Sequence, residues 1–388
     1  MERLTVVVLL ILVAVSCAGS AAASSLNSAL EKVVEAQLVE LDTGAVERAL
    51  ADIDADIQAQ LPSLDLQEII FGRRGLEWGR LVQELSQYLF REVVANLRLL
   101  TGLLVLAVMG ALLQNLQASF ASSDSIDVST ACCLLLLLYL SINSFQVAVA
   151  AGAGAINAMT SLMYALLPLL STTLAAVGGV TSAAIMHPIL AAAVGMMGLL
   201  VQQMIFPLLQ AAVVLGIAGN LFHEFPVKRL AGILERAGSL LLGTAFVTFA
   251  AVVTSRGMLA PVADGVTMRA AKYLGGKIMP ILGNTFSQAL DVAVGGSLLI
   301  KNGLGVLGLC GILLMAAFPL AKILALVFIY RMATAVIEPI SDPRLVSAMT
   351  SCGNILTAVF VAVMTVTLAF FLTITLMVGM GNLTAVLR

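Results

Sequence analysis

The sequence predicts an all-α fold, namely a polytopic helical membrane protein with about seven to nine spans or re-entrant segments. A small exported helical region precedes the spans. Hydrophobic residues make up 60% of the 388 residues and charged residues only 11%, and the mean hydropathy is +1.06. A soluble domain is about half apolar and about a quarter charged. Several apolar runs also reach the roughly 20 residues that a helix needs to cross a bilayer core about 30 Å thick.

The first element is a short apolar segment over residues 4–15, which follows Arg3 and ends in small residues before Ala23. This pattern predicts a signal peptide over residues 1–23 that is cleaved after Ala23. Two alternatives stay open, namely a lipoprotein signal with Cys17 as the lipidated residue and an uncleaved anchor.

The second element is residues 24–96, the only section that resembles a soluble protein. Apolar residues recur there at helical spacing in three groups: Leu26, Leu30, Val33, Leu38 and Leu41, then Leu50, Ile53, Ile57 and Leu61, then Leu81, Leu85, Leu89 and Val93. We expect two or three amphipathic helices on the exported side. They form a cap on the membrane domain, or a docking surface for partners.

The third element is a membrane domain over residues 97–388. Its candidate spans are 97–116, 131–150, 160–180, 183–201, 203–221, 238–254, 304–329 and 353–378. Residues 278–300 are apolar but contain Asp291 and several glycines, so they are expected to form a broken or re-entrant helix covered by protein. The charges leave the orientation of the loops 117–130 and 255–277 open, because the first carries only acidic residues and the second carries basic ones.

Two ranges of the membrane domain, 183–254 and 278–378, have similar landmarks. Arg229 and Gly238 in the first range have the same spacing as Arg344 and Gly353 in the second. Each range would contain three spans, an odd number, so the two copies are expected to have inverted topology. Many transporters have this arrangement, with binding sites at the interface between the repeats.

Ionisable residues inside apolar runs are functional candidates because burying a charge in hydrocarbon is costly. Lys322 follows Pro319 within a span, and Asp291 lies in the segment 278–300. His187 precedes Pro188 within another span, where it is either a satisfied polar residue at a helix break or part of a proton relay. Lys322 either extends its stem to the membrane surface or pairs within a polar conduit.

Recognised catalytic and ligand-binding patterns are missing from the sequence. The five cysteines form no CxxC pair, the only histidines are His187 and His223, and no Walker A motif occurs. We therefore expect no enzyme activity, no catalytic residues, no metal site and no cofactor. The net charge of −2 also gives no bulk attraction for nucleic acid.

A polar stretch over residues 261–302 points to a family. It reads PVADGVTMRAAKY from Pro261, PILG from Pro280, and Lys301-Asn302 at its end. This stretch resembles the stage III sporulation protein AE family of endospore-forming bacteria. The resemblance continues in Asn143-Ser144-Phe145, Phe318-Pro319, Ile329-Tyr330 and Gly381-Asn382-Leu383-Thr384, and it covers nearly the whole chain after residue 85.

The resemblance implies a non-enzymatic membrane subunit of the channel or feeding complex between mother cell and forespore, needed for spore development after engulfment. The implied location is the mother-cell membrane around the forespore. The implied partners are the other stage III sporulation membrane proteins and, across the intermembrane space, stage II sporulation protein Q. A stand-alone secondary transporter for a small solute is the alternative. The candidate conduit or assembly residues are Asp264, Arg269, Lys272, Asp291, Lys301, Lys322 and His187.

Overall fold

The computed structural model describes residues 78–387 apart from 121–122, 221–226 and 279–282, together with Gly44 and Arg48. The predicted signal peptide and most of residues 24–77 lie outside these ranges. Every described element in residues 78–387 is helical, so the all-α prediction is confirmed. The elements are α5 (Trp78–Ala95), α6 (Leu97–Phe120), α7 (Ser123–Ala176), α8 (Val180–Leu200), the π-helix η1 (Val201–Ile205), α9 (Phe206–Ala218), α10 (Val227–Ile278), α11 (Gly283–Ile337) and α12 (Pro343–Leu387).

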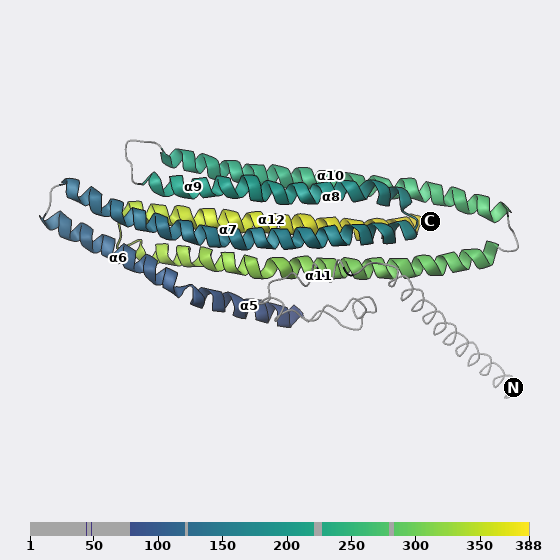
Figure 1. Ribbon diagram of the computed structural model, residues 1–388, viewed down its shortest axis with the longest axis horizontal. Coiled ribbons are helices and arrows are strands. Elements are labelled where there is room, and N and C mark those ends of the chain that lie inside the picture. The colour runs from purple at the N-terminus through teal and green to yellow at the C-terminus, as the bar shows by residue number, and fades with distance from the viewer. Residues whose placement is uncertain are drawn as a thin grey trace, which may run out of the picture.

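The helices form an elongated bundle in which the chain runs back and forth along one axis (Figure 1). α7 and α12 lie along its middle. α8, α9 and α10 pack on one side of this pair, and α11 with α5 and α6 packs on the other. The turn between α7 and α8 and the C-terminal end of α12 lie at the same end of the bundle.

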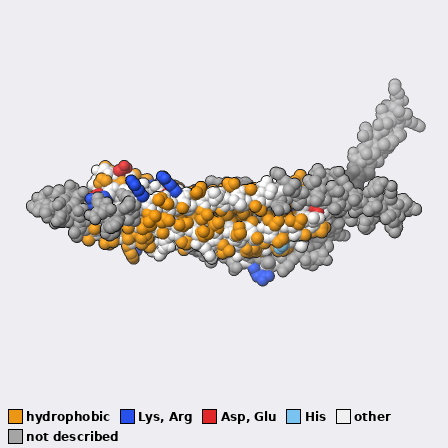
Figure 2. Space-filling view, turned by 90° about the horizontal axis from the view of Figure 1, so that it is seen from above, with side chains coloured by type: hydrophobic (Ala, Val, Ile, Leu, Met, Phe, Trp, Pro, Cys, Tyr) orange, Lys and Arg blue, Asp and Glu red, His pale blue; other side chains and the backbone are white. Residues whose placement is uncertain are grey.

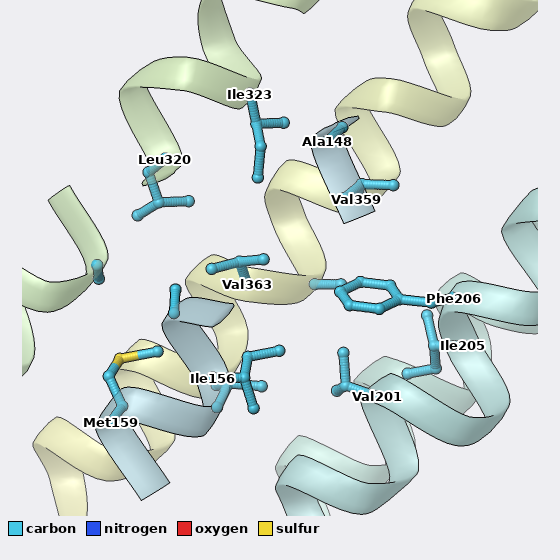
Figure 3. Packing of buried hydrophobic residues seen from close by; sticks show 14 of the residues in the cluster. Ala148, Ile156, Met159, Val201, Ile205, Phe206, Leu320, Ile323, Val359 and Val363 are labelled. Carbon is cyan, nitrogen blue, oxygen red and sulfur yellow. The ribbon is translucent and has the colours of Figure 1, made fainter. Parts of the chain in front are cut away.

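The core contains aliphatic and aromatic side chains from α6 to α12, including η1. In Figure 3, Phe206 of α9 and Val201 of η1 point toward Ile156 of α7 and Val363 of α12, and Ile323 of α11 lies nearby. All five side chains are buried. The outer surface is apolar as well: Figure 2 shows hydrophobic side chains over most of the described part of one face. A continuous apolar surface of this kind is typical of helices that face lipid.

The described helices are longer than the predicted spans. Five are long and apolar enough to cross a membrane, or six if the pair α5 and α6, bent by 42°, forms one span. The expected spans 131–150 and 160–180 both belong to α7, which is continuous. The expected spans 183–201 and 203–221 likewise lie on one helical path. Over the described residues there are thus five to six candidate membrane-spanning helices where seven to nine spans or re-entrant segments were expected, because windows of span length divide long apolar helices into pieces.

A π-helical turn joins α8 to α9. The amide of Phe206 donates to the carbonyl of Val201, five residues earlier, instead of the usual four. Pro207 follows at once; it has no amide hydrogen, and its ring would clash with a carbonyl in regular α-helical position. The wider π turn lets the helix continue past Pro207. The expected spans 183–201 and 203–221 therefore form one helical path.

The similar ranges 183–254 and 278–378 differ from the expected arrangement. The first covers α8, η1, α9 and half of α10, and the second covers α11 and most of α12. Each range thus contains two long helical paths where three spans were expected. Because two crossings return the chain to its starting side, α8 and α9 run in the same direction as α11, and α10 in the same direction as α12 (Figure 1). The inverted relation does not match these directions, and a common origin of the two ranges stays a prediction.

The segment 278–300 is helical from Gly283 onward and continues without a break into the rest of α11. The expected broken or re-entrant helix is therefore replaced, over residues 283–300, by the first turns of a 55-residue helix. Residues 279–282 of this segment lie outside the described ranges.

Candidate functional site

The polar stretch 261–302 forms the last part of α10 and the first part of α11. Figure 1 shows these two helices running past the C-terminal end of α12. Of the five candidate residues in this stretch, Asp264 and Lys301 have described side chains. Arg269 and Lys272 lie on α10 and Asp291 lies on α11, but their side chains are outside the described part of the structure. The structure thus places the candidates on two arms of one hairpin.

Asp264 binds the N-terminus of α8. Its Oδ1 accepts the amide of Thr181 at 3.0 Å, and its Oδ2 accepts the amide of Ser182 at 3.0 Å and also the Ser182 hydroxyl. The carboxylate is 1% exposed. The first amides of a helix have no partner within it, and the helix dipole favours a negative charge there. Asp264 therefore caps α8 from a different helix.

A tight glycine turn explains why α8 needs this distant cap. Gly178 has φ 105°, a left-handed conformation that favours glycine. Gly179 is the N-cap residue of α8 and has no side chain that could bind the free amides. The turn that reverses the chain between α7 and α8 thus leaves the N-terminus of α8 to a carboxylate supplied by α10.

Lys301 binds the C-terminal part of α12 from α11. Its side chain is 0% exposed, and Nζ donates to the carbonyl of Val378 at 2.7 Å. A Cβ atom at position 381 would overlap the Lys301 ammonium, so Gly381 provides the space that the lysine occupies. A buried ammonium needs a polar partner, and the carbonyl of Val378 supplies it. Lys301 and Gly381, distant in sequence, form one contact.

Asp264 and Lys301 have opposite charges and bind the backbones of different helices. Asp264 binds the first turn of α8, and Lys301 binds a carbonyl in the last third of α12. Both contacts lie at the end of the bundle where the chain ends (Figure 1). Each arm of the polar hairpin is therefore fixed to the bundle by one buried charge.

The remaining two candidates lie elsewhere in the bundle. His187 of α8 is half-buried, and its Nδ1 lies 3.3 Å from the hydroxyl of Ser171 of α7. This contact fits the interpretation of a satisfied polar residue beside Pro188. Lys322 of α11 is also half-buried, one turn after Pro319. Among the described residues, no group of three metal-binding side chains is present.

A buried polar cluster was not predicted as a site. The Tyr330 hydroxyl lies 3.2 Å from the hydroxyl of Ser144 and 3.3 Å from that of Ser141, and Cys352 Sγ lies 3.2 Å from the same Ser141 oxygen. These side chains join α7, α11 and α12 and are buried. The sequence indicates this cluster only through Ser141 and Ser144, which lie about one helical turn apart in an apolar run. Its partner cannot be identified from spacing, because Tyr330 is 186 residues from Ser144.

Comparison with known proteins assigns the family. A family model described as stage III sporulation protein AE matches residues 63–381. This chain belongs to the stage III sporulation protein AE family. A curated relative in the family, stage III sporulation protein AE of Bacillus subtilis (strain 168), is 34% identical over 361 residues, which is 92% of this chain and 90% of the relative. No solved structure matches the chain.

Family membership confirms the resemblance that the polar stretch 261–302 indicated. Together with the long apolar helices, it identifies a sporulation-related membrane protein. It does not favour the alternative of a stand-alone transporter. Lys301 and Gly381, two of the positions that carried the resemblance, are the two that meet at the C-terminal part of α12.

Proposed function

We propose that this protein is a non-enzymatic membrane subunit of the channel or feeding complex between mother cell and forespore. It resides in the mother-cell membrane around the forespore and supports spore development after engulfment. Its partners are other stage III sporulation membrane proteins and, across the intermembrane space, stage II sporulation protein Q. Family membership supports the sporulation part of this proposal.

The observation that carries the assembly role is the attachment of the polar hairpin by Asp264 and Lys301. Both side chains are almost completely buried, and each binds backbone atoms of a different helix. Burying a charge costs several kcal/mol unless it is well paired. Buried charges of this kind are expected where the position of the attached segment matters for function. A hairpin held at both arms is suited to present its remaining charged residues, Arg269, Lys272 and Asp291, to a partner protein or to a conduit.

The test is complementation of a deletion strain with single variants of the hairpin. Asp264→Ala, Arg269→Ala and Asp291→Ala are expected to leave vegetative growth and membrane insertion intact. Spore formation should fail after engulfment, with late forespore transcription lost. Heat-resistant spore counts and immunoblots of the membrane fraction measure the two effects.

Asp342→Ala is the matched control. Asp342 Oδ1 also accepts a backbone amide near a helix start, that of Arg344 at 2.7 Å, but it lies in the turn between α11 and α12 at the other end of the bundle. Spore counts near wild type are expected for this variant. Full spore yield from all three hairpin variants at normal protein levels would overturn the proposal.

A further inference from the structure

We propose that two copies of this protein pair in the membrane through one polar face of α7. Six exposed residues of this helix follow one another at spacings of three or four residues, so they lie on one side of it. They carry amide or hydroxyl groups or are small, and none is charged. We call them the α7 face: Gln146, Ala150, Gly154, Asn157, Ser161 and Tyr164.

Most of the α7 face lies at the depth of the membrane interior. A Cβ atom at Gly152 of α7 would lie 3.8 Å from Ile323 of α11, and one at Gly308 of α11 would lie 2.6 Å from Leu166 of α7. α11 has no charged residue over positions 302–321. Residues between 152 and 166 of α7 therefore run beside this uncharged part of α11, and they include Gly154, Asn157, Ser161 and Tyr164.

The neighbouring helices expose a different kind of surface. α11 exposes Val306 and Leu313, and α12 exposes Val361 and Leu368. Lipid chains are a good environment for such side chains, but they offer no hydrogen-bond partner to an amide or a hydroxyl. Across membrane helices, amide and hydroxyl side chains instead bind one another. The α7 face is therefore suited to contact protein rather than lipid.

An amide pair on the α7 face is complementary to a second copy of itself. Gln202 of η1 donates through Nε2 to Asn157 Oδ1 at 2.9 Å. Among the described residues, neither Asn157 Nδ2 nor Gln202 Oε1 has a hydrogen-bond partner, so one donor and one acceptor remain at the same depth. Rotating a second copy by 180° about the membrane normal brings its acceptor toward the first donor and its donor toward the first acceptor. Two-fold symmetry thus forms both bonds at once.

The α7 face also permits the close approach that these bonds need. A Cβ atom at Gly154 would meet nothing within 4 Å, so open space lies beside the helix there. Ala150 is four residues earlier, on the same side. Small residues at this spacing let two membrane helices approach until their backbones touch. Because the face has no charge, repulsion between like charges does not oppose a symmetric pair.

Disulfide formation between copies in native membranes tests the pairing. Two forms of the full chain with different epitope tags are produced together, each with Cys132→Ser to remove an exposed thiol and with Ser161→Cys. Oxidation by air and copper phenanthroline should join two chains in a product that carries both tags. A Ser161→Cys product that lacks the second tag, which would indicate another partner, would overturn the proposal.

Leu313→Cys is the matched control for depth and exposure. Leu313 is exposed on α11 five residues after Gly308, and Ser161 lies five residues before its neighbour Leu166 on the antiparallel α7. The control should give roughly fivefold less product than Ser161→Cys. Equal yields at the two positions, including no product at either, would also overturn the proposal.

A bulky side chain at Gly154 separates pairing from folding. In one copy the new side chain enters open space, whereas in the pair it holds the two helices apart. Gly154→Leu should therefore lower the Ser161→Cys yield roughly fivefold at an unchanged protein level. Gly243→Leu is the control, because Gly243 is an exposed glycine of α10 where a Cβ atom likewise meets nothing within 4 Å. A yield that survives Gly154→Leu would contradict close packing of α7 on α7.

Removal of the amides is a second, independent test. Asn157→Leu with Gln202→Leu should lower the Ser161→Cys yield to a similar extent, because the reciprocal bonds are lost. Asn354→Leu removes an exposed amide from α12 and should leave the yield unchanged. A yield that is the same in all three proteins would show that the amides do not join the copies.

Discussion

Single buried polar atoms hold distant parts of this protein together. Lys301 depends on the missing side chain of Gly381, and Tyr330 depends on two serines of another helix. In a membrane protein, apolar contact between helices offers little advantage over contact with lipid, so such polar contacts contribute to specificity. Each can be tested by removing or adding a few atoms.

Gly381→Ala is expected to destabilise the protein by about 1–3 kcal/mol, since the new methyl group overlaps the Lys301 ammonium in a packed interior. Thermal unfolding of the detergent-solubilised protein, followed by fluorescence-detected size exclusion, measures the change. Gly379→Ala is the control, because a Cβ there meets nothing within 4 Å. Equal stability of the two variants would show that Lys301 can move aside without cost.

Tyr330→Phe is expected to cost about 0.5–1.5 kcal/mol, because the hydroxyl that contacts Ser141 and Ser144 is removed. The same melting assay applies. In a double-mutant cycle, Ser144→Ala should cost less in the Tyr330→Phe background than in the wild type. Tyr139→Phe should leave the melting temperature unchanged, since Tyr139 is largely exposed.

The start of α8 depends on a carboxylate from α10. Asp264→Asn keeps the shape of the side chain but removes the charge, and an amide can accept through only one oxygen. The amides of Thr181 and Ser182 are therefore expected to exchange with solvent roughly tenfold faster. Hydrogen exchange with mass spectrometry measures this rate, and peptides from α12 serve as the internal control. Unchanged exchange at α8 would show that the Asp264 cap does not stabilise the helix start.

The sequence predicts helices and their apolar character well, and the boundaries of individual spans poorly. Composition and run length are local properties, so α7, α11 and α12 are foreseen as membrane helices. The continuity of α7 through residues 151–159, between two expected spans, is not foreseen, because hydropathy is equally high on both sides of a break and within a continuous helix. The passage from α8 to α9 depends on a π turn that no residue pattern announces.

The candidate site was predictable as a list of charged residues, but its contacts were not. Asp264 and Lys301 are conspicuous because they interrupt apolar sequence. Their partners are backbone atoms of Thr181, Ser182 and Val378, and backbone atoms carry no sequence signal. Only the glycines at 178, 179 and 381 hint at unusual backbone or a close approach.

At the scale of the whole molecule, the helices exceed one membrane thickness. The apolar part of α7, Ala131–Ala176, has 46 residues. At about 1.5 Å per residue it is roughly 70 Å long, against about 40–45 Å for a complete bilayer. The charged residues limit where the bilayer can lie along the bundle. α10 carries no charged residue between Arg236 and Arg256, and α11 carries none between Lys301 and Lys322. Both intervals match a hydrocarbon core of about 30 Å.

A single cysteine at Val247, in the middle of the uncharged part of α10, is therefore expected to resist a membrane-impermeant maleimide. A cysteine at Ile340, in the turn between α11 and α12, is expected to react once both membrane faces are accessible. Both positions are well exposed, at 66% and 61%, so burial within the protein does not distinguish them. Labelling of inverted and right-side-out vesicles, with Cys132 replaced by Ser, is the measurement. Equal labelling at the two positions would refute this placement of the bilayer.

The two buried charges also have a consequence for biosynthesis. Ser182 leaves the ribosome 82 residues before Asp264, and Lys301 leaves it 77 residues before Val378. Until translation reaches the later partner, the first turn of α8 lacks its carboxylate and the Lys301 ammonium lacks its carbonyl. The final contacts of α8 and α11 can therefore form only after α10 and α12, respectively, have been synthesised.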